Sequence, residues 1–350
     1  MSKSYCSDGP NGYPRDYIRR FEHMPKPRVI GIVLAVLIGG SFEQALANND
    51  PPELECHFIA GNFRILYTLE GKSSVSKQDQ DQSGVPDRIE NLARQLNVAY
   101  RLYCEVLEFP DPLQSSRFKE ATCIQVVVHH RENGNGTAYD ELSRARPILG
   151  ESPEEKVLVI SIGTHVDPIH NVTPAHELFH LIQYGATYFK NRWYLEGMTR
   201  WAEHGISSQA IGDIRYDLDG PWPQSSDEQA KLFYRSYDAE YTLWNPIAAV
   251  TDDAEILPRS TPLRELASVR YSDGTPVMED LKLRGAAVMR DVLVELRRLD
   301  DIAFQELSYQ RWSEANQVSE NNNRYIYQGI MRSLKRHGGN VVGDQSEGVP

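Results

Sequence analysis

Residues 173–203 read TPAHELFHLIQYGATYFKNRWYLEGMTRWAE, and this stretch decides how the rest of the chain is interpreted. His176 and His180 are four residues apart, so on a helix their side chains share one face and can bind a single metal ion. A catalytic zinc ion takes three protein ligands and leaves its fourth position to water. Glu177, beside the first histidine, points toward the same ion. The spacing therefore predicts a catalytic zinc site with Glu177 as general base.

The flanking residues predict that this segment is helical. Thr173 suits the N-cap, Pro174 the first helical position and Gly185 the C-terminal cap. Further along, Glu196 and Glu203 are seven residues apart and so share one face of a second helix. Two consecutive helices are therefore expected, one with the histidines and one with the carboxylates.

The motif H-E-x-x-H at residues 176–180, followed by W-x-x-E-G-x-x-x-W-x-E at residues 193–203, resembles the gluzincin metallopeptidases, the clan of thermolysin and the aminopeptidase N-like enzymes. The resemblance implies that Glu196 is the third zinc ligand and that Glu203 orients a zinc-bound histidine. Only fifteen residues separate His180 from Glu196, fewer than in those two families, so a tight connection is required. A G-x-M-E-N exopeptidase signature is not found, which leaves aminopeptidase activity unsupported.

A second stretch, residues 79–90, reads DQDQSGVPDRIE and fits the twelve-residue calcium loop. Its expected calcium ligands are Asp79, Asp81, Ser83, Val85 through its backbone carbonyl, Asp87 and Glu90. Pro86 replaces a branched apolar residue and a strand precedes the loop, so a paired EF-hand is not expected. A lone loop of dockerin or thrombospondin-repeat type with a structural Ca²⁺ fits better. The alternative is an acidic turn that caps the following helix, residues 87–107.

Residues 58–203, with a strand, this loop, A-H-E-L-F-H and W-x-x-E-G in that order, also resemble a group of secreted bacterial metalloproteases of gluzincin type. That resemblance implies an α+β, zincin-like fold, with a small mixed sheet packed on the metal-binding helices and a C-terminal helical lobe. It says little about substrate. Gluzincins also use a later Tyr or His to stabilise the oxyanion. Tyr234, Tyr237 and Tyr241 are the candidates, and Tyr241 is preferred; the alternative for each is aromatic packing in a helix.

The remaining patterns predict the other elements. Expected strands are residues 63–68, 123–130 and 156–163, and expected helices are residues 276–299, 302–312 and 324–336. Residues 131–155 read as a surface loop, and whether residues 157–162 form the substrate-binding edge of the sheet stays open. The expected division is a signal peptide at 1–47, a strand, calcium-like loop and helix at 48–110, a catalytic region at 111–260, a helical lobe at 261–337 and a disordered tail at 338–350.

Basic residues, an apolar run at 29–40 and Ala45-Leu46-Ala47 follow one another in the order of a secretory signal peptide, with cleavage after Ala47. The run is short for a bilayer, so stable membrane insertion is not expected after cleavage; a permanent anchor is the alternative. The net charge of −12 becomes −14 without the leader, which holds six Lys/Arg and four Asp/Glu. This acidic balance disfavours nucleic acid as a partner.

The sequence thus predicts a secreted or periplasmic zinc peptidase that acts on peptide or protein substrates. The alternative is a secreted calcium-binding surface or interaction protein whose zinc site is vestigial or structural. A structural zinc would have no use for Glu177 between its ligands, which favours the enzyme.

Overall fold

The computed structural model describes residues 4–6, 54–146, 155–206, 223, 225–252, 260–278, 281 and 283–339. The predicted leader, apart from residues 4–6, and the predicted tail beyond residue 339 lie outside these residues. The strands are β1 (Ser4–Cys6), β2 (Cys56–Ala60), β3 (Phe63–Tyr67), β4 (Ala121–His129), β5 (Gly136–Ala138), β6 (Ser143–Arg144) and β7 (Lys156–Gly163). The α-helices are α2 (Asp87–Tyr100), α3 (Thr173–Ala186), α4 (Arg192–Glu203), α5 (Ser226–Phe233), α6 (Asn245–Thr251), α7 (Thr261–Ala267), α8 (Ala286–Glu306), α9 (Glu314–Gln317) and α10 (Asn323–Arg336). Short π and 3₁₀ helices are η1 (Arg101–Val106), η2 (Pro112–Gln114), η3 (Ser116–Phe118), η4 (Glu240–Trp244) and η5 (Glu320–Asn322).

The described strands form one mixed sheet in the order β1-β2-β3-β4-β7-β5, and β6 also pairs with β7. Strands β3, β4 and β7 run parallel, whereas β1, β2, β5 and β6 pair antiparallel with their neighbours. Parallel neighbours need a crossover, and α2 lies in the chain between β3 and β4. The predicted α+β class, with a small mixed sheet and helices, is confirmed.

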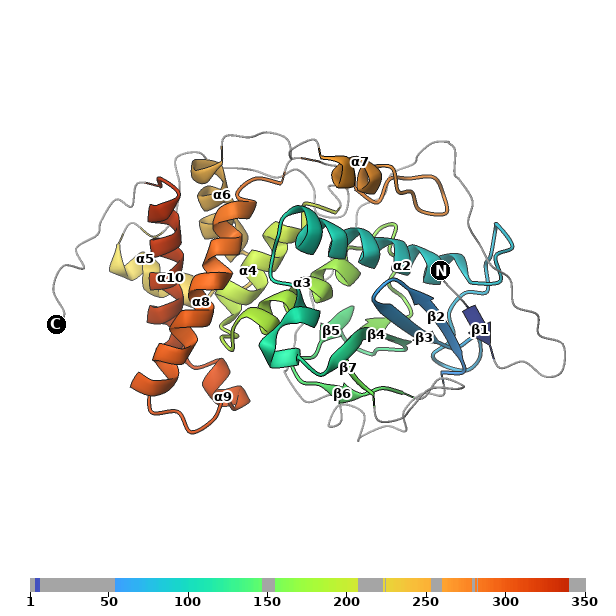
Figure 1. Ribbon diagram of the computed structural model, residues 1–350, viewed down its shortest axis with the longest axis horizontal. Helices are drawn as coiled ribbons and strands as arrows, with labels where there is room; N and C mark the ends of the chain where they lie inside the picture. Colours follow the sequence, from blue (N-terminus) through green and yellow to red (C-terminus); the bar gives the residue numbers. More distant parts are fainter. Residues whose placement is uncertain are drawn as a thin grey trace.

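The two central strands are buried on both faces, as their apolar sequences predict. Val126 and Ile160 belong to the main core, while Val127, Val157 and Val159 belong to a smaller cluster. Successive residues of a strand point to opposite faces, so the two clusters lie on opposite sides of the sheet. Figure 1 shows α2 and α3 along the sheet, with the later helices α5, α6, α8 and α10 grouped beyond α4.

The expectation of a surface loop over residues 131–155 is wrong. This segment contains β5 and β6, which both pair antiparallel with β7, so β7 is an interior strand and β5 and β6 together form this edge of the described sheet. The two strands are short, and β5 begins with a glycine that disfavours strand formation in isolation. They form because β7 offers unpaired backbone groups on that side.

Among the C-terminal helices, residues 323–336 match the prediction, but the predicted helices 276–299 and 302–312 are wrong. One helix, α8, begins at Ala286 after Gly285 in a left-handed conformation with φ of 76°. It continues to Glu306 because Leu296, Leu299 and Ala303 extend a single buried face. Within the described part of the chain, no helix has the length and apolar character needed to cross a bilayer.

Candidate metal centre

Helix α3 carries the two histidines, and its ends differ from those predicted. Thr173 is the first helical residue rather than the N-cap, which is Val172. Gly185 lies inside the helix, where the Ser115 hydroxyl donates to its carbonyl at 2.6 Å. A Cβ on Gly185 would come within 3.4 Å of the Cα of Pro112, so this glycine permits close packing instead of ending the helix.

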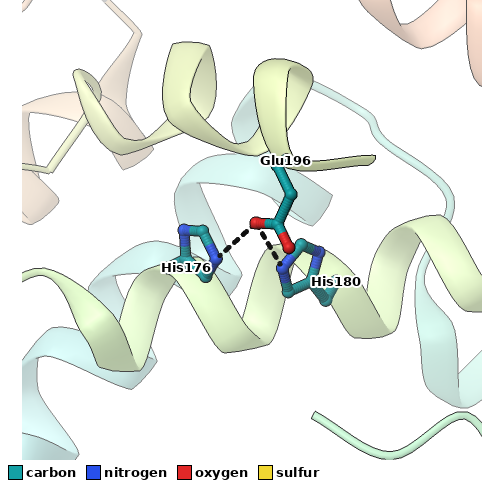
Figure 2. A group of neighbouring side chains, drawn as sticks. All are labelled: His176, His180 and Glu196. Atoms are coloured by element: carbon teal, nitrogen blue, oxygen red, sulfur yellow. Dashed lines mark ion pairs between the residues drawn. The ribbon is translucent and has the colours of Figure 1, made fainter. Parts of the chain in front are cut away.

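The three predicted zinc ligands lie together. The rings of His176 and His180 are 4.5 Å apart on α3. Glu196 reaches down from α4 between them, with its Oε2 3.4 Å from His176 Nε2 and 3.6 Å from His180 Nε2, as Figure 2 shows. One ligand atom from each residue lies within 4.8 Å of the others, and all three residues are buried. This group could therefore hold a metal ion.

The hydrogen bonding of these side chains also indicates that the group could hold a metal ion. His180 Nε2, Glu196 Oε2 and Glu177 Oε2 are buried, and none has a hydrogen-bond partner among the described residues. Buried polar atoms without partners are costly and rare in folded proteins, so several at one point call for a ligand. Two imidazole nitrogens and one carboxylate oxygen are a donor set that zinc accepts.

Burial and neighbouring charges shift the pKa values of the residues at this centre in opposite directions. Burial lowers the pKa of His176, but the carboxylates of Glu196 and Glu203 outweigh it and raise that pKa to about 10. Burial raises the pKa of Glu196, yet His176 and His180 hold it well below its usual range. Burial also raises the pKa of Glu177, and here it prevails over the two histidines. Glu177 is thus the carboxylate of the group that binds a proton more readily than usual.

A carboxylate behind His176 fixes the orientation of that ring. Glu203 Oε1 lies 2.5 Å from His176 Nδ1. Arg200 donates to the other oxygen of Glu203 and lies 3.4 Å from Glu240 Oε2. The far nitrogen of His176 is left facing Glu196. This is the position that the sequence predicts for Glu203, and its support by Arg200 and Glu240 could not be read from the motif.

His180 has a separate support that the sequence analysis missed. Its Nδ1 lies 2.9 Å from Gln183 Oε1, and the Thr199 hydroxyl donates to the same oxygen at 2.8 Å. Gln183 Nε2 in turn donates to the Leu195 carbonyl at 3.0 Å, which ties α3 to α4. The available signal was spacing, because Gln183 is three residues after His180 and Thr199 three after Glu196.

Glu177 lies against the edge strand of the sheet. A Cβ on Gly136 in β5 would be 2.8 Å from both Cγ and Oε1 of Glu177, so only glycine fits this close approach. The Gly136 carbonyl accepts from Arg131 at 3.2 Å. The positive charge of Arg131 lowers the pKa of Glu177 slightly, against the larger effect of burial. The Asn-Gly-Asn-Gly sequence at residues 133–136 was part of the predicted surface loop and gave no sign of this contact.

Of the three candidate tyrosines, Tyr237 is the one beside the metal ligands. Its ring centroid is 6.1 Å from that of His176. Tyr241 is 48% exposed and lies beside Arg200, while Tyr234 is 80% exposed. A further tyrosine that the sequence analysis did not consider, Tyr184, stacks on His180 at 5.8 Å.

The tight connection between α3 and α4 is held by the C-terminal helices. The Thr187 hydroxyl and the Tyr188 amide both donate to Asp300 Oδ2 on α8, at 2.8 and 2.9 Å. Lys190 pairs with Glu314 on α9 at 2.8 Å and with Asp140 at 2.9 Å. The short loop therefore reaches its conformation through contacts that are distant in the sequence.

The predicted calcium ligands also lie close together. Ligand atoms of Asp79, Asp81 and Asp87 all lie within 4.8 Å of one another. The Ser83 hydroxyl lies 3.5 Å from Asp79 Oδ1 and 3.3 Å from the Val85 carbonyl. Glu90, the last predicted ligand, pairs with Arg94 at 2.7 Å and also interacts with Ser83.

Comparison of the chain with family models, with curated proteins and with solved structures found no significant match. The similarity to gluzincins therefore depends on the motif residues, and the site has to be interpreted from its own geometry.

Proposed function

We propose that this protein is a secreted, zinc-dependent peptidase of gluzincin type with a zincin-like catalytic fold. The observation that carries the proposal is the convergence of His176, His180 and Glu196 on one buried point. Beside it lies Glu177, whose Oε2 has no hydrogen-bond partner among the described residues. A purely structural zinc site is closed by four ligands and needs no additional base. Calcium at residues 79–90 is a separate proposal, because peptide hydrolysis does not use that loop.

Zinc held by these ligands would act as a Lewis acid and lower the pKa of a coordinated water. Glu177 accepts the proton of the attacking water, whose oxygen bonds to the peptide carbonyl carbon. When the carbon–nitrogen bond breaks, Glu177 returns that proton to the departing amine. Burial raises the pKa of Glu177, which makes its carboxylate a stronger base than one in water.

Tyr237 is the best candidate to donate a hydrogen bond to the developing oxyanion. It belongs to the segment between α5 and η4 and its ring lies against His176. Burial, together with the charges of Glu196 and Glu177, raises its pKa above the usual value, so its hydroxyl keeps its proton at neutral pH. A hydroxyl in its neutral form can donate, as oxyanion stabilisation requires.

Because the proposed reaction is hydrolysis of a peptide bond, the proposed substrates are peptides or proteins. The expected route out of the cytoplasm is the N-terminal leader, and the acidic net charge disfavours nucleic acid. The second interpretation, a calcium-binding surface protein with a vestigial or structural zinc site, requires no turnover. The buried Oε2 of Glu177, which has no partner among the described residues, favours the enzyme.

The test combines metal content with turnover. Purified mature protein should contain one zinc per chain and cleave casein or a peptide library, with activity lost to a zinc chelator and restored by added zinc. A Glu177→Gln variant should keep the zinc and lose about 10²- to 10⁴-fold in kcat. Stoichiometric zinc without any cleavage would favour the second interpretation. Absence of zinc, or full activity of the variant, would overturn the proposal.

A further inference from the structure

The loop before α2 concentrates negative charge around a buried, unpartnered oxygen. Asp87 is 6% exposed, and within the described part of the chain its Oδ2 has no hydrogen-bond partner. Its other oxygen accepts from the Gln80 amide at 3.1 Å, and the ligand atoms of Asp79 and Asp81 are within 4.8 Å. Three like charges at this spacing repel one another, and a buried carboxylate oxygen without a partner is costly. A bound cation removes both penalties.

The other oxygens at this point favour calcium among the common cations. The Ser83 hydroxyl lies 3.5 Å from Asp79 Oδ1, and the Val85 carbonyl lies 3.3 Å from that hydroxyl, so neutral and charged oxygens are both available. Ca²⁺ takes six to eight oxygens at variable geometry, whereas Mg²⁺ demands a regular octahedron and keeps several waters. Gly84, at φ of 86°, supplies the sharp turn that brings the donors together.

Helix α2 connects this loop to the metal helix α3. The helix begins at Asp87, and the next residue, Arg88, donates to the Thr164 carbonyl in the segment that leads to α3. Gln95, fully buried, donates to the Pro168 carbonyl at 2.8 Å and accepts from the Ala175 amide at 3.2 Å. The N-cap residue of α3, Val172, has no side-chain acceptor, and the Asn171 carboxamide accepts from the Thr173 amide at 2.8 Å. Gln95 supplies a further acceptor at this helix end, for the amide one residue before His176.

We propose that residues 79–90 bind Ca²⁺ and that calcium bound there strengthens metal binding by His176, His180 and Glu196. A cation that holds Asp87 orders the first turn of α2 and hence Arg88. The same helix positions Gln95, which holds the first turn of α3 in the arrangement that presents the histidines. Zinc then binds to His176, His180 and Glu196 with a smaller loss of conformational entropy, because calcium has already ordered the helix that presents the histidines. This second part rests on the proposed zinc centre, whereas calcium binding itself does not.

Calcium binding is tested without zinc, by thermal unfolding of protein stripped with a zinc-selective chelator. Saturating Ca²⁺ should raise Tm by roughly 5 °C, and equal Mg²⁺ should raise it less. The matched variant is Asp81→Asn with Asp87→Asn, because both asparagines keep an oxygen for the amides of Ser83 and Gln80 while removing two charges. It should not respond to Ca²⁺. No calcium shift in the wild type, or an equal shift in the variant, would overturn the proposal.

The coupling is tested by zinc affinity, measured by chelator competition with and without calcium. Calcium should tighten zinc binding by at least about fivefold, and zinc should tighten calcium binding by the same factor. Arg88→Met should keep calcium binding and reduce the factor by which calcium tightens zinc binding. Folded Gln95→Met protein should show a still smaller factor. Equal zinc affinity with and without calcium would overturn the coupling. A calcium shift in Tm without any zinc binding would instead count against the proposed peptidase alone.

Discussion

The candidate metal centre and the acidic loop differ in where the residues that position their charged side chains come from. At the centre, His176 and His180 are supported by side chains from α3 and α4, and the loop between those helices is fixed by α8 and α9. In the acidic loop, the hydrogen bonds of Asp79 within the described ranges come from the loop itself, from the amides of Ser83 and Gly84 and the Ser83 hydroxyl. The first site depends on tertiary packing and the second on local geometry, so distant substitutions should disturb the first more than the second.

Glu196→Gln should produce the largest effect. The carboxylate lies between both histidines, and its replacement by a neutral amide removes the proposed third zinc ligand and the charge that balances His176. Zinc affinity should fall by more than about 100-fold, the upper range for loss of an outer partner. The calcium-dependent rise in Tm should persist, because the loop keeps all its donors. Zinc affinity within tenfold of the wild type, by chelator competition, would show that Glu196 is not a ligand.

Thr199→Val should cause the next largest loss of zinc affinity, although Thr199 is not one of the proposed ligands. Valine has nearly the same shape but cannot donate to Gln183 Oε1, so the acceptor of His180 Nδ1 is less well fixed. Zinc affinity should fall by about 10- to 100-fold, with far-ultraviolet circular dichroism unchanged. Thr199→Ser keeps the hydroxyl and is the matched control. Equal zinc affinities of the two variants would contradict a positioning role for this hydroxyl.

The same contrast explains what the sequence could and could not predict. The ligand pair and the acidic loop were readable because each lies within one short segment with fixed spacing. Strand β5 was missed because Gly136 and its neighbours become a strand only by pairing with β7. The choice among the tyrosines depended on how residues 234–241 pack on α4, which no local pattern specifies. The close approach of Gly136 to Glu177 is likewise a tertiary contact.

Asp300→Asn tests the distant support of the metal centre through pH. Burial raises the pKa of Asp300 to about 6, although the hydrogen bonds from Tyr188 and Thr187 lower it. The nearby charge of Asp301 adds to the rise. The folded state therefore binds this proton more tightly, so its stabilising contribution is complete below pH about 4 and is lost as pH rises through about 6. Asparagine keeps an acceptor for Thr187 and Tyr188 without titrating.

Relative to the wild type, the Asp300→Asn variant should therefore gain stability between pH 4 and 7, by about 2 kcal/mol after allowance for solvent screening. Denaturant unfolding at several pH values measures this difference. Asp301→Asn, on the exposed face of α8, is the control and should show a smaller change. A difference between wild type and Asp300→Asn that does not vary over this pH range would contradict the raised pKa.

Gly84→Ala should have the smallest effect on stability, and it tests whether the calcium response depends on the local geometry of residues 79–90. Gly84 has φ of 86° and Gly71 has φ of 71°, and a Cβ at either would meet nothing within 4 Å. Each alanine should therefore cost only backbone strain, about 1–2 kcal/mol in denaturant unfolding without calcium. Gly84→Ala should also weaken the calcium response, since the Gly84 amide donates to Asp79 Oδ2 at 2.8 Å in the turn that gathers the carboxylates. Gly71→Ala should leave that response unchanged. If both variants lost it equally, the response would come from general stability instead of the geometry of residues 79–90.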